Sequence, residues 1–311
     1  MTSFKDKVER FKKNPSYYIK LIVFKSFSRY LTDKKFLKIY YHLRTGRKLN
    51  LDNPQTFSEK IQWLKLYDRN PVYTVMADKY KSKDYIGNII GMEHIVPLID
   101  VWDNANKINF DSLPNKFVLK CNHDSRSWVF CDDKNELNIH KVKKFLNKKL
   151  KTNHYMKSRE WSYKNIDRKI IAEKYIEDPK DKSGYIGLTD YKFFCTNGVA
   201  RIMFITHDID ENSTFDAFDM NFNHLDMFKI FNEPVQPKKP KCFDDMRLAA
   251  EKISKGIPFV RVDFYIVNNQ YYFGEMTFYP LSGFLPPSTS KWDSIIGEWI
   301  KLPDISNINY N

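Results

Sequence analysis

A short stretch near the C-terminal end, residues 259–280, constrains the fold more than any other part of the chain. Two runs rich in apolar and aromatic residues flank the polar residues 268–270, Asn-Asn-Gln, which predicts a β-hairpin with its turn at these three positions. When the strands are folded about Asn269, Asp263 lies opposite Glu275. The hairpin thus places two carboxylates side by side, about 5 Å apart at Cβ.

Side chains alternate between the two faces of a strand, so Arg261 and Thr277 form the next pair on the face of these carboxylates. Paired carboxylates repel unless a proton or a cation lies between them, and we therefore predict a metal site on this face. The alternative is a surface hairpin with scattered charges. A two-residue turn without a bulge would shift the pairing by one residue, and Asp263 would then no longer lie opposite Glu275. The opposite face carries apolar side chains: Val260, Val262, Phe264 and Met276.

The composition bounds the class of protein. The chain has 311 residues, 42% of them hydrophobic, which is enough for a large core in two or three lobes. Its 51 Lys and Arg exceed its 38 Asp and Glu, giving a net charge of +13. This surplus favours an anionic partner, such as a nucleotide phosphate, an acidic polysaccharide, a membrane surface or a nucleic acid. We do not expect nucleic acid, because the basic helix predicted at residues 134–151 is typical of a solvated face.

The cysteines and the hydropathy indicate the compartment. The four cysteines lack the spacing of a metal site and are interpreted as reduced thiols of a cytoplasmic protein. A bridge between Cys121 and Cys131 is the alternative, because these residues fall on neighbouring predicted strands. No apolar run reaches about 18 residues, so a soluble or peripheral protein is expected.

The first 50 residues are basic and aromatic, with a helical rhythm in which Phe4, Val8 and Phe11 recur. Residues 17–31 form an apolar stretch with interspersed cations. We favour a helix packed on the main body. The alternative is a helix in a membrane interface with its cations facing anionic lipid, at the inner face of the membrane.

Further elements follow along the chain. Thr56 and Glu59 form a capping box that opens a helix, and a second helix is predicted over residues 73–86. Residues 91–103 predict two short β-rich runs. Further expected elements are strands at 117–120, 128–131 and 169–176, a hairpin at 191–205 with an Asn-Gly turn, and helices at 243–256 and 292–300.

Lys120 ends the apolar strand 117–120 and precedes a polar loop, residues 121–127. A strand lysine beside such a loop can hold phosphates, since the lysine supplies charge and the loop supplies N–H donors. Strand lysines also commonly lie on solvated faces, so this signal alone is weak.

Taken together, these pieces resemble the ATP-grasp enzymes, and within them the branch associated with teichuronopeptide and capsular-polysaccharide synthesis. The resemblance rests on their order: FVLK, the polar loop, IIAEKYI, DYKFFCTNG, RVDFYI and YYFGEMTFYP. It also includes DNPQTFSEKIQWLKLYDRNP and IVPLIDVWDN, and it spans residues 40–285. The implied fold class is α+β (α/β), with antiparallel sheets and helices forming a nucleotide cleft behind a mostly helical N-terminal segment.

The resemblance implies four segments and a set of roles. The segments are 1–55 (basic N-terminal helices), 56–115 (N-terminal lobe), 116–176 (ATP-binding subdomain) and 177–311 (C-terminal lobe with the metal hairpin). ATP would be held by Lys120, His123, Ser125, Glu173, Lys174, Tyr175, Ile176 and Asp190. Mg²⁺ would be held by Asp263, Glu275 and Thr277, and the catalytic cations would be Arg261, Lys192 and Arg126.

Two positions depart from the family pattern. Thr277 stands where an asparagine usually completes the metal motif, and a hydroxyl is a weaker ligand than an amide oxygen. The phosphate loop often carries glycine, whereas here residues 123–126 read His-Asp-Ser-Arg. These departures bear on activity more than on fold.

The implied activity is ATP- and Mg²⁺-dependent joining of a carboxylate to an amine through an acylphosphate. We expect an anionic saccharide, a uronic acid of a surface polysaccharide, and a small amine or amino acid as substrates, with contact to a membrane or to polysaccharide-assembly machinery. One alternative is a sugar-nucleotide glycosyltransferase with Asp208 and Asp210 as an acidic metal motif. The other is a non-catalytic anion- or membrane-binding protein.

Overall fold

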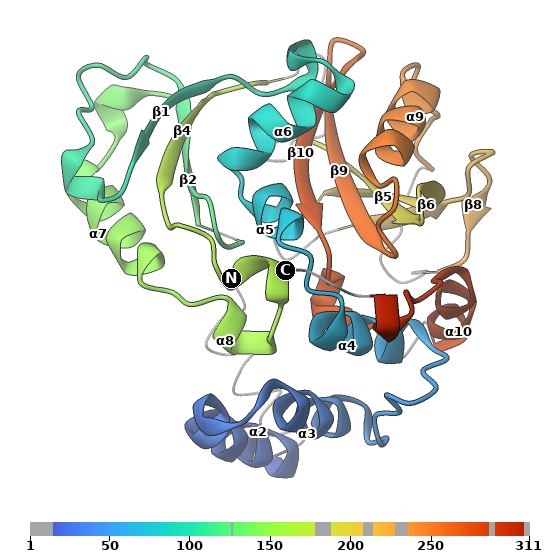
Figure 1. Cartoon of the computed structure of the whole chain (residues 1–311). Helices are drawn as coiled ribbons and strands as arrows, with labels where there is room; N and C mark the ends of the chain where they lie inside the picture. Colours follow the sequence, from blue (N-terminus) through green and yellow to red (C-terminus); the bar gives the residue numbers. More distant parts are fainter. Residues whose placement is uncertain are drawn as a thin grey trace.

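Two antiparallel sheets form the scaffold of the computed structural model (Figure 1). The structure describes residues 15–125, 127–177, 188–207, 214–227, 236–285 and 290–307. The larger sheet has the strand order β10-β9-β5-β6-β7-β8 and the smaller one β1-β4-β2-β3. The strands are β1 (Leu98–Trp102), β2 (Phe117–Cys121), β3 (Trp128–Cys131), β4 (Ile170–Lys174), β5 (Asp190–Thr196), β6 (Val199–His207), β7 (Thr214–Phe218), β8 (His224–Leu225), β9 (Val260–Val267) and β10 (Gln270–Thr277).

Helices cover the outer faces of both sheets and connect them. In Figure 1, α5 and α6 lie between the two sheets, α7 lies outside the smaller sheet and α9 outside the larger one. The α-helices are α2 (Pro15–Phe27), α3 (Asp33–Thr45), α4 (Phe57–Tyr67), α5 (Val72–Ala77), α6 (Lys81–Ile90), α7 (Ile139–Leu150), α8 (Tyr155–Ser158), α9 (Phe243–Ile253) and α10 (Ser290–Trp299).

Alternation of side chains divides each strand of the larger sheet between two layers. On one face Phe193 and Phe264 pack together, and Phe243 of α9 contacts Phe193 with ring centroids 6.0 Å apart. On the other face Phe57 of α4 stacks on Phe194 at 6.2 Å. The smaller sheet has its own core, in which β2 and β4 side chains pack against α7. Each sheet thus keeps one apolar face for its outer helix and directs the other toward the centre of the molecule.

The two hairpins of the larger sheet use the turn chemistry that the sequence predicts. Asn197 and Gly198 have φ of 52° and 82°, and Asn268 and Asn269 have φ of 52° and 63°. Positive φ at both central residues is the requirement of a type I′ turn, which only Gly and Asn meet readily. The second turn contains two residues rather than the predicted three, because Gln270 already pairs with Val267 in the ladder.

Helix boundaries differ from the predicted ones where a side chain caps the backbone. The single helix predicted at 73–86 is two helices, because the Asp78 carboxylate accepts hydrogen bonds from Tyr80 N and Lys81 N at 2.9 and 3.4 Å and starts α6 anew. The helix predicted from residue 134 starts at Ile139, capped by Asn138. The capping box of Thr56 and Glu59 is confirmed at α4. In the stretch 91–103, only β1 is a strand, and residues 92–94 form a 3₁₀ turn.

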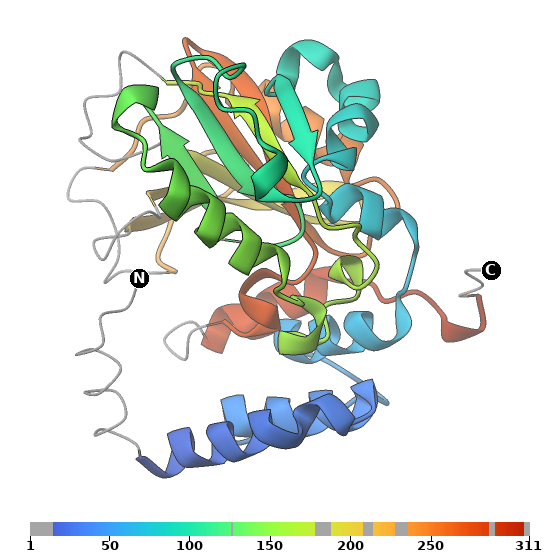
Figure 2. The same cartoon turned by 90° about the vertical axis from the view of Figure 1, so that its left-hand side faces the viewer.

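Helices α2 and α3 form an outer layer at one end of the molecule (Figure 2). Phe24 of α2 is 3% exposed and contacts Phe36 and Tyr40 of α3. The favoured interpretation, a helix packed on the body, is therefore confirmed for this face of α2. The predicted rhythm of Phe4, Val8 and Phe11 lies outside the described residues. The four cysteines are buried free thiols: Cys121, Cys131, Cys195 and Cys242.

Candidate active site

The hairpin of β9 and β10 holds the predicted pairs. Asp263 pairs with Glu275 and Arg261 with Thr277 in the ladder. A two-residue turn alone would have shifted these pairs by one position, but the register changes between Phe273 and Glu275, where Gly274 forms a bulge. The bulge restores the alignment, so the expected pairing is confirmed although the turn is shorter than predicted.

A guanidinium group lies between the two carboxylates. Arg261 Nε donates a hydrogen bond to Asp263 Oδ1 at 2.7 Å, and Arg261 Nη2 lies 3.2 Å from Glu275 Oε1. Thr277 Oγ1 donates to the same Glu275 oxygen at 3.4 Å. The four side chains thus share one face and touch one another. Repulsion between the two carboxylates requires a cation at this position. In the protein without a bound metal, Arg261 is that cation.

The two carboxylates have opposite electrostatic environments. Burial raises the pKa of Asp263 to about 6, against the lowering effect of Arg261 and Lys192. Burial also acts to raise the pKa of Glu275, but Lys79 and Arg261 outweigh it and lower this pKa to about 2. Glu275 therefore keeps its charge over the whole physiological range. Asp263 holds its charge at neutral pH only against the cost of burial.

Lys192 of β5 belongs to the same face of the larger sheet. It pairs with Asp263 in the ladder, and its Nζ lies 2.8 Å from Asp190 Oδ2. The ammonium also donates a hydrogen bond to Thr206 of β6. Its side chain is 7% exposed. Lys192 and Asp190, to which the resemblance gives separate roles as a catalytic cation and an ATP contact, thus form one ion pair beside the hairpin.

Across from the hairpin, the smaller sheet presents Lys120 and Glu173. These residues come from the neighbouring strands β2 and β4, and Lys120 Nζ forms a 2.5 Å salt bridge with Glu173 Oε2. Lys83 of α6 contacts the other carboxylate oxygen at 2.7 Å and also donates to the carbonyl of Val96. Burial would raise the pKa of Glu173, but Lys120 and Lys83 lower it to about 2. Glu173 is thus a buried carboxylate that forms salt bridges with two lysines.

Lys79, which the sequence analysis did not identify, links the two sheets. Its Nζ lies 2.9 Å from Glu275 Oε2 and donates to the carbonyl of Asp124 at 2.9 Å. The preceding residue, Asp78, accepts a hydrogen bond from Asn122 at the start of the polar loop. One dipeptide at the N-terminal end of α6 therefore contacts both the hairpin and the loop. The sequence signal was the run DKYKSKD, in which helical periodicity alone assigns the lysines to a solvated face.

The polar loop places its predicted residues differently from one another. His123 is 2% exposed, and its Nε2 lies 3.1 Å from the carbonyl of Thr152, within hydrogen-bonding distance. Ser125 is exposed. Asp124 accepts a hydrogen bond from Ser127 and is buried. Arg126, the predicted third catalytic cation, lies outside the described residues. Ser125 is thus the predicted loop residue that reaches the surface.

The segment after β4 leads from the smaller sheet toward the larger one. Lys174 is exposed, and its backbone N donates to the carbonyl of Pro97 at 2.9 Å. Tyr175 is half-buried, with its ring against Phe130 and below the ammonium of Lys116. Ile176 is also half-buried. The loop that follows and the acidic pair Asp208 and Asp210 of the glycosyltransferase alternative fall on residues outside those described.

The donor set of the hairpin fits a hard divalent cation that shares its coordination with phosphate. Asp263, Glu275 and Thr277 offer only oxygen atoms, the donors that Mg²⁺ prefers. Among the described residues there is no group of three His, Cys, Asp or Glu that could hold a metal ion alone. Mg²⁺ is usually bound by one or two carboxylates, waters and substrate phosphates, so two carboxylates suffice. A metal at this position would replace Arg261 as the cation between them.

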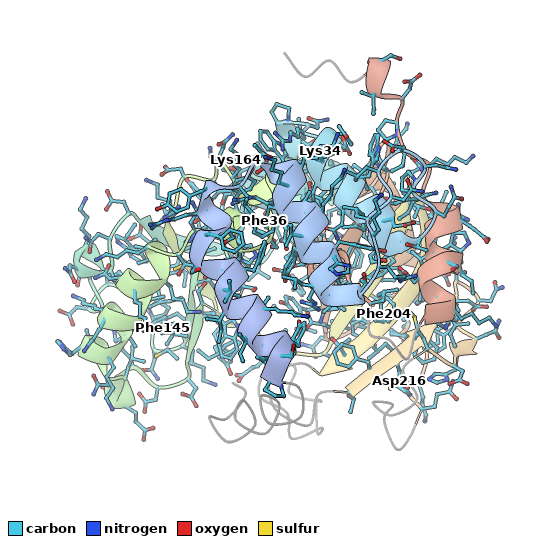
Figure 3. All side chains as sticks on the ribbon, turned by 90° about the horizontal axis from the view of Figure 1, so that it is seen from below. Lys34, Phe36, Phe145, Lys164, Phe204 and Asp216 are labelled. Atoms are coloured by element: carbon cyan, nitrogen blue, oxygen red, sulfur yellow. The ribbon has the colours of Figure 1, made fainter. Side chains whose placement is uncertain are left out.

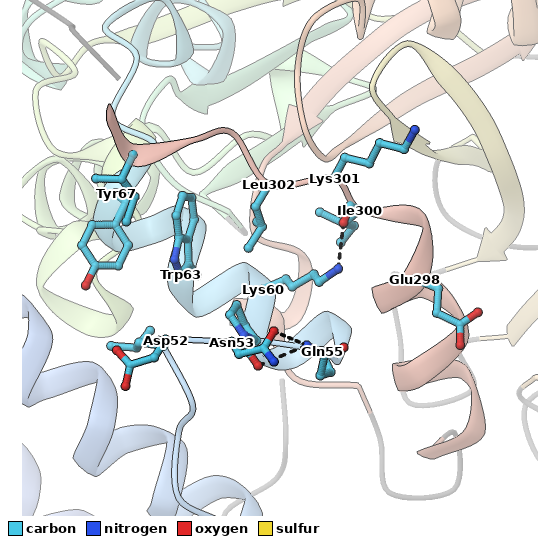
Figure 4. Close-up of a pocket in the computed structure, with 13 residues that line it drawn as sticks. Asp52, Asn53, Gln55, Lys60, Trp63, Tyr67, Glu298, Ile300, Lys301 and Leu302 are labelled. Atoms are coloured by element: carbon cyan, nitrogen blue, oxygen red, sulfur yellow. Dashed lines mark hydrogen bonds between the residues drawn. The ribbon is translucent and has the colours of Figure 1, made fainter. Parts of the chain in front are cut away.

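A cavity of about 700 Å³ lies elsewhere, between the segment before α4, α4 itself and the C-terminal segment (Figure 4). Trp63 and Tyr67 form one wall, and Lys60 reaches across to donate to the carbonyl of Ile300 at 2.8 Å. None of the predicted site residues lines this cavity. In the described part of the chain, no helix has the length and apolar character needed to cross a membrane.

Comparison with protein families gives one match. A family described as TupA-like ATPgrasp matches residues 59–301, which is more than half of the chain. The match begins in α4 and ends just after α10, so it contains both sheets and every described residue of the site. No relative was found among curated proteins.

The solved structures to which the chain is similar share little sequence with it. D-alanine–D-alanine ligase from Bacillus anthracis has a TM-score of 0.42 and 16% identity, covering 71% of this chain and 65% of its own. The same enzyme from Helicobacter pylori has a TM-score of 0.41 and 14% identity, covering 80% of this chain and 68% of its own. N5-carboxyaminoimidazole ribonucleotide synthetase from Thermus thermophilus has a TM-score of 0.40 and 11% identity, covering 66% of this chain and 45% of its own. The chain thus spans less than two thirds of the length of the first and third of these proteins.

Proposed function

Because the chain belongs to the TupA-like ATP-grasp family, we propose that it is an ATP- and Mg²⁺-dependent ligase that joins a carboxylate to an amine through an acylphosphate. The family assignment confirms the predicted ATP-grasp fold. One observation carries the proposal of activity: Asp263 and Glu275 lie paired on the hairpin, next to Lys79, Lys192 and Arg261. Such a set of oxygen donors and cations suits a nucleotide triphosphate with its metal.

The nucleotide would lie between the two sheets. Lys120 and Lys79 would exchange their carboxylate partners for phosphate oxygens, with His123 and Ser125 in the covering loop. The segment Glu173, Lys174, Tyr175 and Ile176 would form the hinge that holds adenine, with Asp190 on the ribose hydroxyls. Two facts support these assignments: Glu173 and Lys120 form an ion pair at the end of the smaller sheet, and Lys79 contacts both sheets.

Mg²⁺ would be held by Asp263, Glu275 and Thr277, and when bound it would neutralise charge on the phosphates of the nucleotide. Displaced from the carboxylates, Arg261 would remain next to them, where its guanidinium can contact the transferring phosphoryl group. Lys192 would supply a second cation from β5. Both side chains approach from the same face of the larger sheet, which fixes the direction in which the phosphoryl group is held.

The chemistry requires activation, because the oxygen of a carboxylate is a poor leaving group. The substrate carboxylate attacks the γ-phosphorus, ADP leaves, and an acylphosphate forms. The amine then attacks the acyl carbon, phosphate leaves, and an amide remains. Negative charge builds on the phosphoryl oxygens in the first step, so Lys79, Lys120, Lys192 and Arg261 act by electrostatic stabilisation.

We infer the substrates from charge and from the family. The surplus of 13 positive charges favours an anionic acceptor such as the uronic acid of a surface polysaccharide, with a small amine or amino acid as its partner. We also propose a cytoplasmic enzyme that works beside a membrane or polysaccharide-assembly machinery, and the division into 1–55, 56–115, 116–176 and 177–311. Strand β1 of the second segment pairs with β4 of the third, so these two segments share one sheet.

The test is ADP release with a panel of uronic acids and amines. The wild-type chain should release more than one ADP per enzyme only when Mg²⁺, a uronic acid and an amine are all present, because without the amine the reaction stops at the acylphosphate. Asp263→Asn should abolish this activity, whereas Asp103→Asn, at an exposed carboxylate outside the site, should leave it unchanged. Continued ADP release without the amine, beyond one per enzyme, or any ADP release without the metal would reject the proposal.

A further inference from the structure

Helix α2 is apolar on both of its faces. Phe24 faces α3 and is 3% exposed, whereas Ile19, Ile22 and Val23 on the other side are 52%, 62% and 54% exposed. The spacing 19, 22, 23 places these three side chains on one face of the helix. They form a continuous stripe that no described residue covers, and stripes of this kind mark a surface that binds a partner.

Cations border this stripe on both sides. On a helical projection, Lys20 and Lys25 fall on opposite flanks of the Ile19–Ile22–Val23 stripe, and both are exposed. Arg29 follows in the next turn, and Tyr30 beside it is 74% exposed. Residues 15–31 contain no Asp or Glu. An apolar stripe with flanking cations and an exposed tyrosine is the pattern of a helix that lies in the interface of an anionic bilayer.

The position of α2 in the molecule leaves this face accessible. Figure 3, seen from below, shows α2 and α3 lying across the surface of the molecule. Helix α3 adds three exposed lysines to the same end: Lys34, Lys35 and Lys38. These lysines add positive charge to the end of the molecule that carries the stripe.

We propose that the outer face of α2 docks the chain on an anionic lipid surface, with Ile19, Ile22 and Val23 inserted among the acyl chains and the lysines on the headgroups. The helix has 13 residues, about 20 Å in length, which is too short to span a bilayer and matches a helix parallel to its surface. Charge complementarity selects the lipid: a neutral surface would offer nothing to the cations. The inference is independent of the proposed ligase activity.

Vesicle binding by the full chain tests this. Co-sedimentation is measured with vesicles of phosphatidylcholine alone and with phosphatidylglycerol added. Binding is expected only to the anionic vesicles and should weaken with salt. Lys20→Gln with Lys25→Gln should lower the partition coefficient about 25-fold, about fivefold for each lysine. Ile22→Ser should lower it about tenfold, because an exposed isoleucine would no longer be buried in the bilayer.

A matched control uses the other basic helix. Lys141 and Lys144 of α7 are exposed, and changing both to Gln removes the same charge from a helix outside the smaller sheet. This variant should bind anionic vesicles within twofold of wild type. Equal loss in the α7 variant, binding to neutral vesicles, or no binding at all would overturn the proposal. A dimer in solution that Ile22→Ser dissociates, in a chain that does not bind vesicles, would assign the stripe to a second copy instead.

Discussion

Asp263 and Glu275 lie opposite each other, yet they differ in the protonation state that burial and the neighbouring charges favour. Lys79 and Arg261 stabilise the charge of Glu275, whereas burial dominates at Asp263 and raises its pKa to about 6. A buried carboxylate whose charge is unfavourable gains most from a divalent cation, because the metal supplies the charge that the protein does not. Asp263 should therefore contribute more to the free energy of metal binding than to the free energy of folding.

The variants Asp263→Asn and Glu275→Gln test this difference. Both should lower Mg²⁺-dependent ADP release by at least about 100-fold, since each removes a ligand of the proposed metal site. At pH 7, Glu275→Gln should lower the free energy of unfolding more than Asp263→Asn, because it leaves Lys79 without its partner carboxylate. Urea denaturation measures the second effect. A larger loss of stability in Asp263→Asn would contradict this assignment of charge.

Glu173 offers a second prediction at this scale. Its carboxylate neutralises both Lys83 and Lys120, and its side chain is 6% exposed. Glu173→Gln should lower the free energy of unfolding by about 3 kcal/mol, because two cations lose their anion in a buried setting. The control is Glu177→Gln, whose exposed pair with Lys116 should contribute nothing measurable. Equal effects in the two variants, measured in urea, would show that the Glu173 pair is not structural.

Among the elements, the turn after β10, residues 280–283, packs against α4. Leu281, Ser282 and Gly283 all have positive φ, of 52°, 56° and 77°. Two non-glycine residues in this region cost energy that the surroundings must offset. Ser282 does so through its contacts: its hydroxyl donates to Glu160 at 2.8 Å and its carbonyl accepts from Lys65 Nζ at 2.9 Å. The buried contacts thus fix the direction in which the chain leaves the site.

Gly283→Ala should disrupt this turn. A Cβ at Gly283 would lie 2.5 Å from Ile61 Cγ2 and 2.6 Å from Gln62 Nε2, in addition to the strain of φ +77°. We expect a loss of about 3 kcal/mol in the free energy of unfolding. Gly46→Ala is the matched control, because Gly46 also has positive φ but no atom within 4 Å of its Cβ position. It should cost only about 1 kcal/mol in the same urea titration. Equal losses would mean that backbone strain, rather than close packing, requires Gly283.

At the scale of the whole molecule, the buried carboxylates determine how stability depends on pH. The pKa values of Glu173 and Glu275 fall from the ordinary 4.5 to about 2 on folding. A lowered pKa means that the folded state binds protons less readily than the unfolded state. Their stabilisation is complete above pH 4.5 and is lost as the pH falls toward 2. Asp263 acts in the opposite direction, since its pKa rises from 3.8 to about 6 and protonation between these values relieves a cost.

Denaturation in urea at pH 7, 5 and 3 should show the sum of these effects. The free energy of unfolding should rise by about 1 kcal/mol from pH 7 to 5, as Asp263 takes up its proton, and fall between pH 5 and 3, where two glutamates oppose one aspartate. In Asp263→Asn the opposing contribution disappears, so the fall should be at least as large. A stability that stays constant down to pH 3 would contradict the charge distribution of both sheets.

Local sequence patterns were sufficient to predict the hairpin, its paired carboxylates and most of the elements around it. These are local properties: side-chain alternation assigns faces, Asn-Asn and Asn-Gly favour the two turns, and Thr56 with Glu59 starts α4. The order of the strand motifs was also sufficient to indicate the ATP-grasp family. The bulge at Gly274 compensates for the short turn, so a correct pairing followed from an incorrect turn length.

The full set of cations in the site follows from the three-dimensional packing of the chain. Lys79 and Lys83 lie far from the hairpin in sequence, in a stretch whose periodicity predicts a solvated helix face. Lys79 immediately precedes α6 and Lys83 lies on it, and they reach Glu275 and Glu173 only because α6 is placed between the two sheets. The sequence required a cation between the paired carboxylates but could not specify its identity. Arg261 lies between the two carboxylates. Charge pairing in a buried site depends on the distances between charges in three dimensions and on their desolvation, and a local sequence pattern predicts neither quantity.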